Sequence, residues 1–211
     1  MRPSLGQKFS VFYASLVYLF LYLPIAILIL YSFNKSKLNA VWTGFTLDWY
    51  FQLMHNNDVL EAMRTSLIVA IVSTLAATMI GTLAAVGLYR YHFRGKTALD
   101  AMLYLPIVIP EIVMGISLLA LFATLKMPLG YFSLIAAHIT FSVPFVIVVV
   151  RARLAGFDKS IEEAAMDLGA TPWQTFVKVT IPVIAPGILA SALLAFTLSI
   201  DDVIISFFVA G

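Results

Sequence analysis

The sequence predicts an all-α membrane protein, a single polytopic helix bundle over residues 1–211 with five membrane-spanning segments. Hydrophobic residues make up 62% of the chain and charged residues only 11%, whereas a soluble domain is nearer half apolar and a quarter charged. Five apolar segments are each long enough to cross a bilayer core of about 30 Å, which takes about 20 helical residues. Because so few charges cannot cover a soluble surface, we expect lipid to surround these segments.

The five spans are expected at about residues 10–33, 65–89, 98–125, 129–150 and 183–205. In the third span, Pro106 and Pro110 should break or kink the helix. In the loop after the first span, Thr46 could cap a short helix that carries the membrane-anchoring aromatics Trp49 and Tyr50.

The distribution of Lys and Arg predicts the orientation of the chain. Nine of the 13 basic residues fall in the N-terminal segment and in the loops after the second and fourth spans, and four fall on the other side. Loops rich in Lys and Arg stay in the cytoplasm. We therefore expect a cytoplasmic N-terminus and a cytoplasmic segment at residues 158–182.

Composition also excludes several kinds of function. The chain has no cysteine and a net charge of +2, with its basic residues scattered, so neither thiolate metal sites nor nucleic-acid binding is indicated. His55, His92 and His138 lack metal-ligand spacing, which favours structural or incidental roles and no metal site. No G-x-x-x-x-G-K-[ST] motif occurs, so we expect no ATP site and no enzyme activity in this chain.

Residues 158–182, DKSIEEAAMDLGATPWQTFVKVTIP, form a polar segment between two apolar runs. Ser160 and Glu163 fit an S-x-x-E capping box, which predicts a helix from Ile161. Gly169 suits the left-handed residue that ends such a helix. Thr171-Pro172-Trp173-Gln174 fits a second box, T-x-x-Q, with proline at the first helical position. Pro182 should stop the second helix or begin the fifth span.

One face of the first short helix is apolar. Ile161, Ala164, Ala165 and Leu168 share it through i, i+3, i+4, i+7 spacing. Small alanines allow another protein backbone to approach closely, which favours a docking surface. An interfacial amphipathic helix that caps the bundle would have the same pattern, and the residues alone do not separate the two.

Three acidic residues fall within or at the ends of predicted spans, where ionisable groups are costly. Glu111 could sit at a restarted helix N-terminus, where the helix dipole favours an acid, or on a path for a cationic cargo. Asp201 and Asp202 lie near the outer end of the fifth span. Because adjacent helical residues point in different directions, at most one should face a central path, and the other could cap or pair with a neighbouring helix.

The segment EAAMDLGATPWQTFVKVTIP resembles the EAA loop of ABC importer permeases, in which E-A-A is followed at fixed spacing by Gly, an aliphatic pair and Pro. The positions in register are Glu163, Ala164, Ala165, Gly169, Val179, Ile181 and Pro182, with Val179 where Ile is usual. The resemblance implies the type I importer fold and coupling helices that seat in a groove of a cytoplasmic ATPase. In that arrangement Ala164, Ala165 and Leu168 belong to the docking surface, Glu163 pairs with a basic residue of the ATPase, and Gly169 makes the turn.

Further segments, including GFTLDWY, YRYHFRGK, HITFSVPFV and TLSIDDVIISFFVAG, resemble the second membrane subunit of spermidine/putrescine importers. This resemblance implies a polyamine permease of a bacterial inner membrane. Its partners would be two ATPase subunits that bind ATP and Mg, a second permease subunit and an extracytoplasmic polyamine-binding protein. Glu111, Asp201 and Asp202 would then line the path for the cationic cargo. Tyr104 and Phe141 would be either aromatic walls for cation–π contact or packing residues.

Other functions stay open at this point. Related importer branches carry ferric iron, thiamine or other small solutes. An ion-coupled secondary transporter would use the intramembrane acids as relays, although it gives no reason for the paired capping boxes. A purely structural membrane scaffold would need no ATPase. The importer family normally has one more span after the fifth, so the resemblance implies that this last span is missing here.

Overall fold

The computed structural model describes residues 5–37 and 41–211. The chain forms two compact units, one ending at Ala62 and the other running from Met63 to Gly211, and each is described by itself. Within the described residues the regular structure is helical, with one isolated bridge between Asn34 and Phe45.

The first unit contains α1 (Leu5–Tyr31), α2 (Asp48–Met54) and the beginning of α3 (Asn57–Arg90). The long apolar helix α1 contains no buried side chain in its most hydrophobic stretch. A helix that is apolar on all sides requires lipid or protein around it. The expected short helix is confirmed as α2, but its N-cap residue is Leu47 and not the predicted Thr46. The Thr46 hydroxyl lies one residue earlier and accepts a hydrogen bond from the Asp48 amide at 3.1 Å.

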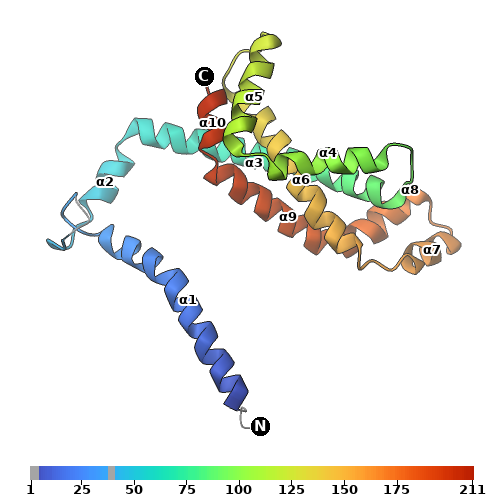
Figure 1. Cartoon of the computed structure of the whole chain (residues 1–211), viewed down its shortest axis with the longest axis horizontal. Coiled ribbons are helices and arrows are strands. Elements are labelled where there is room, and N and C mark those ends of the chain that lie inside the picture. Colours follow the sequence, from blue (N-terminus) through green and yellow to red (C-terminus); the bar gives the residue numbers. More distant parts are fainter. Residues whose placement is uncertain (1–4, 38–40) are drawn as a thin grey trace. The chain divides into compact units, whose positions relative to one another are not determined.

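The second unit is a helix bundle that begins with the rest of α3 (Figure 1). Its further elements are α4 (Lys96–Val108), α5 (Glu111–Thr124), α6 (Tyr131–Leu154), α7 (Ser160–Asp167), α8 (Pro172–Thr175), the π-helical turn η1 (Phe176–Thr180), α9 (Ile181–Asp201) and α10 (Ile204–Val209). Helices α6 and α9 pack along each other, as do α5 and α10 (Figure 1).

Two clusters of buried side chains hold this bundle together. One lies between α3, α6 and α9 and includes Val146, Val150 and Ile184. The other joins α5, α6 and α10 to α3 and includes Phe141 and Ile205.

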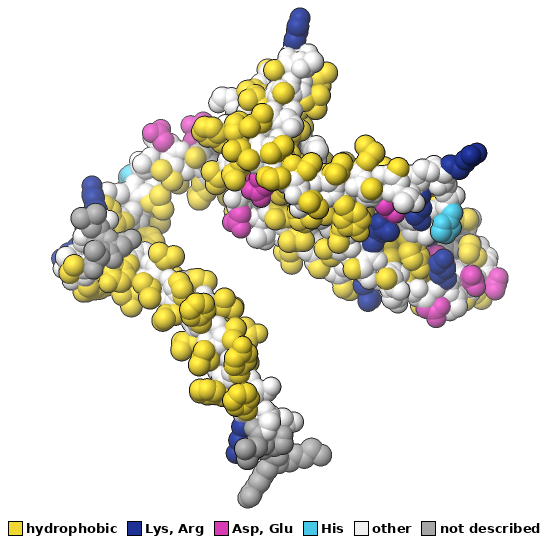
Figure 2. All heavy atoms as spheres, viewed as in Figure 1, with side chains coloured by type: hydrophobic (Ala, Val, Ile, Leu, Met, Phe, Trp, Pro, Cys, Tyr) yellow, Lys and Arg dark blue, Asp and Glu magenta, His cyan; other side chains and the backbone are white. Residues whose placement is uncertain are grey.

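Hydrophobic side chains also cover most of the visible surface, and charged side chains gather at the end of the bundle that carries α7 (Figure 2). This distribution is that of a bundle with lipid along its sides and water at its ends.

Among the described residues, four helices are long and apolar enough to cross a membrane, or up to five if the bent pair α4–α5 is one span. The third predicted span, residues 98–125, is not one continuous helix, because α4 and α5 meet at an angle of 111°. The break falls at Ile109 and Pro110, which confirms the predicted break, whereas α4 continues through Pro106. Pro110 has no amide hydrogen to donate to the helix before it.

The last predicted span also differs in its ends. Its helix runs without a break from Pro172 to Asp201, so Pro182 does not stop the preceding helix but lies in the first turn of α9. The π-helical turn directly precedes that proline. At its other end the predicted continuation to Ile205 is wrong, because the backbone becomes extended at Asp202 and restarts as α10.

Candidate functional site

The polar segment forms a short helix, a turn and a second helix, as expected, but its first cap is different. Helix α7 begins at Ser160, and the Ser160 amide donates to the Asp158 carboxylate at 2.9 Å. The predicted capping box between Ser160 and Glu163 is therefore wrong, because Asp158 supplies the acceptor two residues earlier. Hydrogen bonds from the Ser160 backbone and side chain lower the pKa of Asp158 from its ordinary value.

The turn and the second cap are confirmed. Gly169 has a φ of +91°, the left-handed conformation that ends α7. The Gln174 amide donates to the Thr171 hydroxyl at 3.2 Å, and the Thr171 amide donates to the Gln174 side chain at 2.9 Å. These reciprocal bonds, together with Pro172 at the helix start, fix the direction in which the chain leaves the turn.

Most of the apolar face predicted on α7 is not buried inside the chain. Leu168 is 90% exposed, Ile161 and Ala164 are exposed, and Ala165 is half-buried. Across the turn, Trp173 is 70% exposed. Large exposed apolar side chains on an otherwise polar segment indicate an interaction surface. We call the surface formed by Ile161, Ala164, Ala165, Leu168 and Trp173 the plug surface.

A cluster that the sequence did not reveal bonds α7 to the bundle. Glu162 pairs with Arg90, the last residue of α3, and accepts a hydrogen bond from the Thr180 hydroxyl. The Arg90 guanidinium also donates to the Thr180 hydroxyl at 2.9 Å and lies 5.7 Å from the centre of the Phe176 ring. These residues are far apart in the sequence, so no local spacing points to their contact.

The predicted pathway residues fall into two groups. Glu111, the first residue of α5, is exposed, as are Tyr104 on α4 and Asp201 at the end of α9. Phe141 is only 5% exposed and packs edge-on against Phe145, so it belongs to the core. The position of Glu111 also fits the dipole of a helix N-terminus, so its two interpretations are compatible.

Asp202, in contrast to its neighbour, is held inside the bundle. Its side chain is 3% exposed and accepts hydrogen bonds from the Ile205 amide at 3.1 Å, the Ser206 amide at 2.9 Å and the Ser206 hydroxyl at 3.0 Å. These bonds satisfy the first amides of α10, which explains why the helix restarts there. Asp202 thus caps the start of α10, one of the roles that the sequence left open for one of these two acids.

His138 on α6 joins the same network. Its Nε2 lies 3.0 Å from the Ser206 hydroxyl and 3.5 Å from Asp202, and its Nδ1 lies 2.6 Å from the Ser199 hydroxyl. Because the single Ser206 hydroxyl proton is donated to Asp202, Nε2 must be the donor toward Ser206. Ser199 in turn lies 3.2 Å from the Ser73 hydroxyl, so the network connects α3, α6, α9 and α10.

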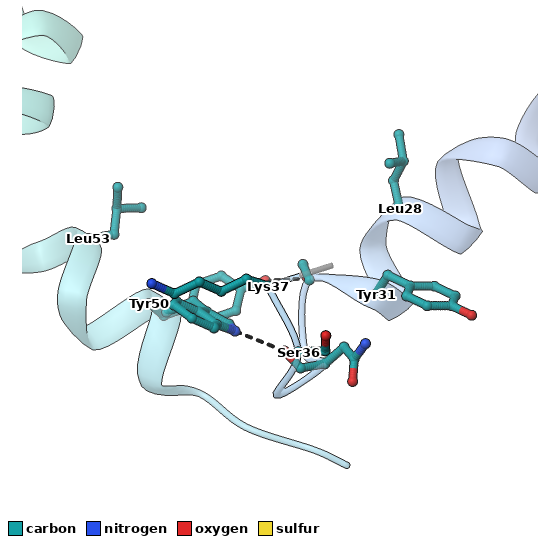
Figure 3. Close-up of a pocket in the computed structure, with 9 residues that line it drawn as sticks. Leu28, Tyr31, Ser36, Lys37, Tyr50 and Leu53 are labelled. Atoms are coloured by element: carbon teal, nitrogen blue, oxygen red, sulfur yellow. Dashed lines mark hydrogen bonds between the residues drawn. The ribbon is translucent and has the colours of Figure 1, made fainter. Parts of the chain in front are cut away.

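The first unit has its own concave feature, an open cavity of about 520 Å³ between the end of α1 and α2 (Figure 3). The Trp49 indole donates to the Asn34 carbonyl oxygen at 2.8 Å, and the Lys37 ammonium lies 5.7 Å from the Trp49 ring centre. The buried Asn34 amide also bonds the backbone at Val41 and Thr43. This loop is consequently held by its own hydrogen bonds.

Comparison with known proteins gives consistent matches. The family described as "Binding-protein-dependent transport system inner membrane component" matches residues 77–211. The chain is 49% identical to the spermidine/putrescine transport system permease protein PotC of Escherichia coli (strain K12), over 92% of this chain and 74% of that protein. It is 42% identical to the putrescine transport system permease protein PotI of the same organism, over 99% of this chain and 77% of that protein.

A more distant relative has a different cargo in its name. The sulfate transport system permease protein CysT of Escherichia coli (strain K12) is 33% identical, over 77% of this chain and 63% of that protein. Among solved structures, a bacterial ABC transporter involved in the import of the acidic polysaccharide alginate matches with a TM-score of 0.70 at 16% identity, over 94% of this chain and 73% of that one. At that identity the likeness supports the fold alone.

Proposed function

Because the chain belongs to the family of binding-protein-dependent transport system inner membrane components, and is thus a membrane-spanning permease subunit of an ABC importer, we propose that its cargo is a polyamine. The observation that carries this proposal is the higher identity to the polyamine permeases, 49% and 42%, than to the sulfate permease, 33%. A polyamine is a flexible chain of ammonium groups, so carboxylates along its path would favour it and disfavour an anion.

We assign the polar contacts of the path to Asp201 and Glu111, with Tyr104 as an aromatic wall. All three side chains are exposed at or near helix ends of the second unit. Ammonium groups are attracted by carboxylates and by the faces of aromatic rings. Such contacts should be weak, since a path that binds its cargo tightly would hold it instead of releasing it.

The plug surface is the proposed contact with the ATPase. Its exposed Leu168 and Trp173 would fill a groove, the small Ala164 and Ala165 would allow close approach, and the exposed Glu163 would pair with a basic residue. The full assembly would contain two ATPase subunits that bind ATP and Mg, a second permease subunit and an extracytoplasmic polyamine-binding protein. The N-terminus and the plug surface would be cytoplasmic, consistent with the excess of Lys and Arg on that side.

The test is reconstitution of this chain with its partner permease, ATPase and binding protein in lipid vesicles. Uptake of labelled spermidine, putrescine and sulfate would be measured together with ATP hydrolysis. Uptake of a polyamine that depends on ATP and the binding protein supports the proposal, whereas uptake of sulfate alone rejects the cargo.

In the same assay, Ala165→Asp should abolish uptake, because it introduces an unpaired charge into the proposed contact. Ala155→Asp, at an exposed position just after α6, is the matched control and should import normally. Normal uptake and normal assembly of the Ala165→Asp complex would reject the plug surface as the ATPase contact.

A further inference from the structure

The cluster around Arg90 joins three segments that are remote in the sequence. Arg90 ends α3, Glu162 lies in the first turn of α7, and Thr180 ends the π-helical turn that leads into α9. Each of the three side chains contacts the other two. The Arg90 and Glu162 side chains are 26% and 16% exposed. A charge-assisted hydrogen bond that is partly shielded from water is stronger and more directional than one on an open surface.

The π-helical turn supplies part of this geometry. Its extra residue per turn changes the direction of the side chains that follow, and such turns often occur at functional positions. Here the turn carries both Phe176, beneath the Arg90 guanidinium, and Thr180, whose side chain is buried and bonded to Arg90 and Glu162. Every polar contact of the Arg90 guanidinium in the described structure therefore leads to α7 or to the start of α9.

The two adjacent glutamates of α7 point to different surroundings. Glu162 faces the bundle through Arg90 and Thr180, whereas Glu163 is exposed. Adjacent residues of a helix lie about 100° apart around its axis, so one short helix can present one acid inward and the next outward. Helix α7 is thus bonded to its own bundle on one side and open to a partner on the other.

Helix α7 depends on this cluster for a rigid attachment. It has only eight residues and is followed directly by the turn at Gly169. A second contact reinforces the same connection, because the Lys159 ammonium lies 5.1 Å from the centre of the Tyr89 ring at the end of α3. Together with the packing of α7 against α8 and η1, these bonds attach α7 to the end of α3 and the start of α9.

We propose that Arg90, Glu162 and Thr180 form a transmission joint that makes α7, the end of α3 and the start of α9 move as one body. The ATPase would displace the plug surface, and the joint would transfer that displacement to the two spans. In this role the three residues position α7 and do not bind ATP or cargo. This inference rests on the proposed ATPase contact and adds a separate role for Glu162.

The joint predicts that its loss separates ATP hydrolysis from import. In the reconstituted complex, Glu162→Gln should reduce the number of cargo molecules imported per ATP hydrolysed by about tenfold, which corresponds to about 1.4 kcal/mol. Asp167→Asn, at an exposed acid of the same helix, is the matched control and should retain the wild-type ratio. An unchanged ratio for Glu162→Gln would overturn the proposal.

A charge exchange distinguishes a joint from a general loss of stability. If Glu162→Gln or Arg90→Gln assembles poorly, the double exchange Arg90→Glu with Glu162→Arg should restore assembly and most of the import ratio, because the Thr180 hydroxyl can bond either partner. An exchanged pair that assembles but imports no better than Glu162→Gln would count against a coupling role.

The joint can also be tested without any cargo, which separates its failure from failure of the polyamine assignment. The chain contains no cysteine, so Met166→Cys on α7 and Leu189→Cys on α9 would carry the only two spin labels, at exposed positions of this subunit. In the otherwise wild-type complex, their distance distribution should be the same with and without trapped ATP. In the complex that carries Glu162→Gln, the distance distribution between the two labels should change when ATP is trapped. Equal behaviour of the two complexes would overturn the joint, whereas a complex that imports no polyamine would reject only the cargo.

Discussion

The close approach of α3 and α6 leads to a quantitative prediction at Gly81. A Cβ atom added there would lie 2.6 Å from Val146 Cγ1, 2.7 Å from Val146 Cβ and 3.3 Å from the Val143 carbonyl oxygen. Favourable carbon–carbon contacts are about 3.5–4.0 Å. Because the Val146 Cβ does not move when that side chain changes rotamer, the two helices would have to separate.

A matched substitution isolates the packing cost. At Gly87, also in α3, a new Cβ meets no atom within 4 Å, so Gly87→Ala changes helix propensity without a clash. Both substitutions gain a similar propensity term, of about 0.8–1.0 kcal/mol in water. The difference between the two variants therefore reports the overpacking at Gly81, for which we expect about 1–3 kcal/mol.

The assay is thermal unfolding of the purified complex in detergent. A difference of this size corresponds to roughly 2–12 °C in Tm for a chain of this length, with Gly81→Ala melting below Gly87→Ala. Adding Val146→Ala should recover only part of the difference, because the Val146 Cβ remains. Equal melting temperatures for the two glycine variants would refute the close helix contact on which this reasoning depends.

Three further predictions concern helix ends. Gly169→Ala should destabilise the turn after α7 by about 1–2 kcal/mol through the left-handed backbone alone, since no atom lies within 4 Å of the new Cβ. A distorted turn should weaken binding to the ATPase, so wild-type affinity of this variant would contradict the prediction. The bonds from Ser160 lower the pKa of Asp158. The ionised carboxylate therefore stabilises the start of α7 fully at a pH above the ordinary pKa of 3.8, and this stabilisation is lost as the pH falls through the lowered pKa. Hydrogen exchange of the first α7 amides, corrected for intrinsic rates, should rise in acid and in Asp158→Ala at neutral pH, because alanine has no oxygen to accept the Ser160 amide. No rise in either case would refute the cap. Asp202→Ala should lower the stability of the complex by about 0.5–2 kcal/mol through loss of the α10 cap. Asp201→Ala should instead leave the Tm unchanged and reduce polyamine uptake. If Asp201→Ala lowers the Tm and Asp202→Ala only reduces uptake, the two roles are exchanged.

Much of the fold was predictable because it depends on local or bulk properties. Low charge content predicted the lipid environment, and the fixed spacing of Thr171 and Gln174 predicted a cap whose two bonds are both present. Gly169 likewise suited a backbone conformation that few other residues adopt. Signals of this kind need only a few neighbouring residues, so the rest of the chain does not alter them.

The sequence was a poor guide where two local signals competed. Ser160 had the spacing of a cap, but Asp158 offers a charged acceptor two residues earlier and binds the Ser160 amide. At the end of α9, Asp202 was assigned to a continuous span, although an aspartate is also a strong helix-start signal. Capping was one of the roles predicted for one of the two aspartates, but the length of the apolar run gave no sign that the helix breaks at Asp202.

The remaining site features could not be predicted because they depend on tertiary contacts. Arg90 and Glu162 lie 72 residues apart and meet only after α3 and α7 are placed by the bundle. His138 has no metal-ligand spacing, and its structural role follows from Ser199 and Asp202, which α9 and the break after it bring to α6. Nothing in the residues next to His138 indicates these partners.

The two pairs of adjacent acids in this chain suggest a common physical logic. In each pair one carboxylate is bonded within the subunit, Glu162 to Arg90 and Asp202 to the start of α10, and its neighbour, Glu163 or Asp201, is exposed. A lone exposed acid at a helix end would sample many orientations as the end frays. When the adjacent residue is fixed by several hydrogen bonds, the backbone of the exposed acid is fixed as well, and less conformational entropy is lost when it meets its partner. The bonded acid would therefore help to position its exposed neighbour, in addition to the joint proposed for Glu162 and the α10 cap formed by Asp202.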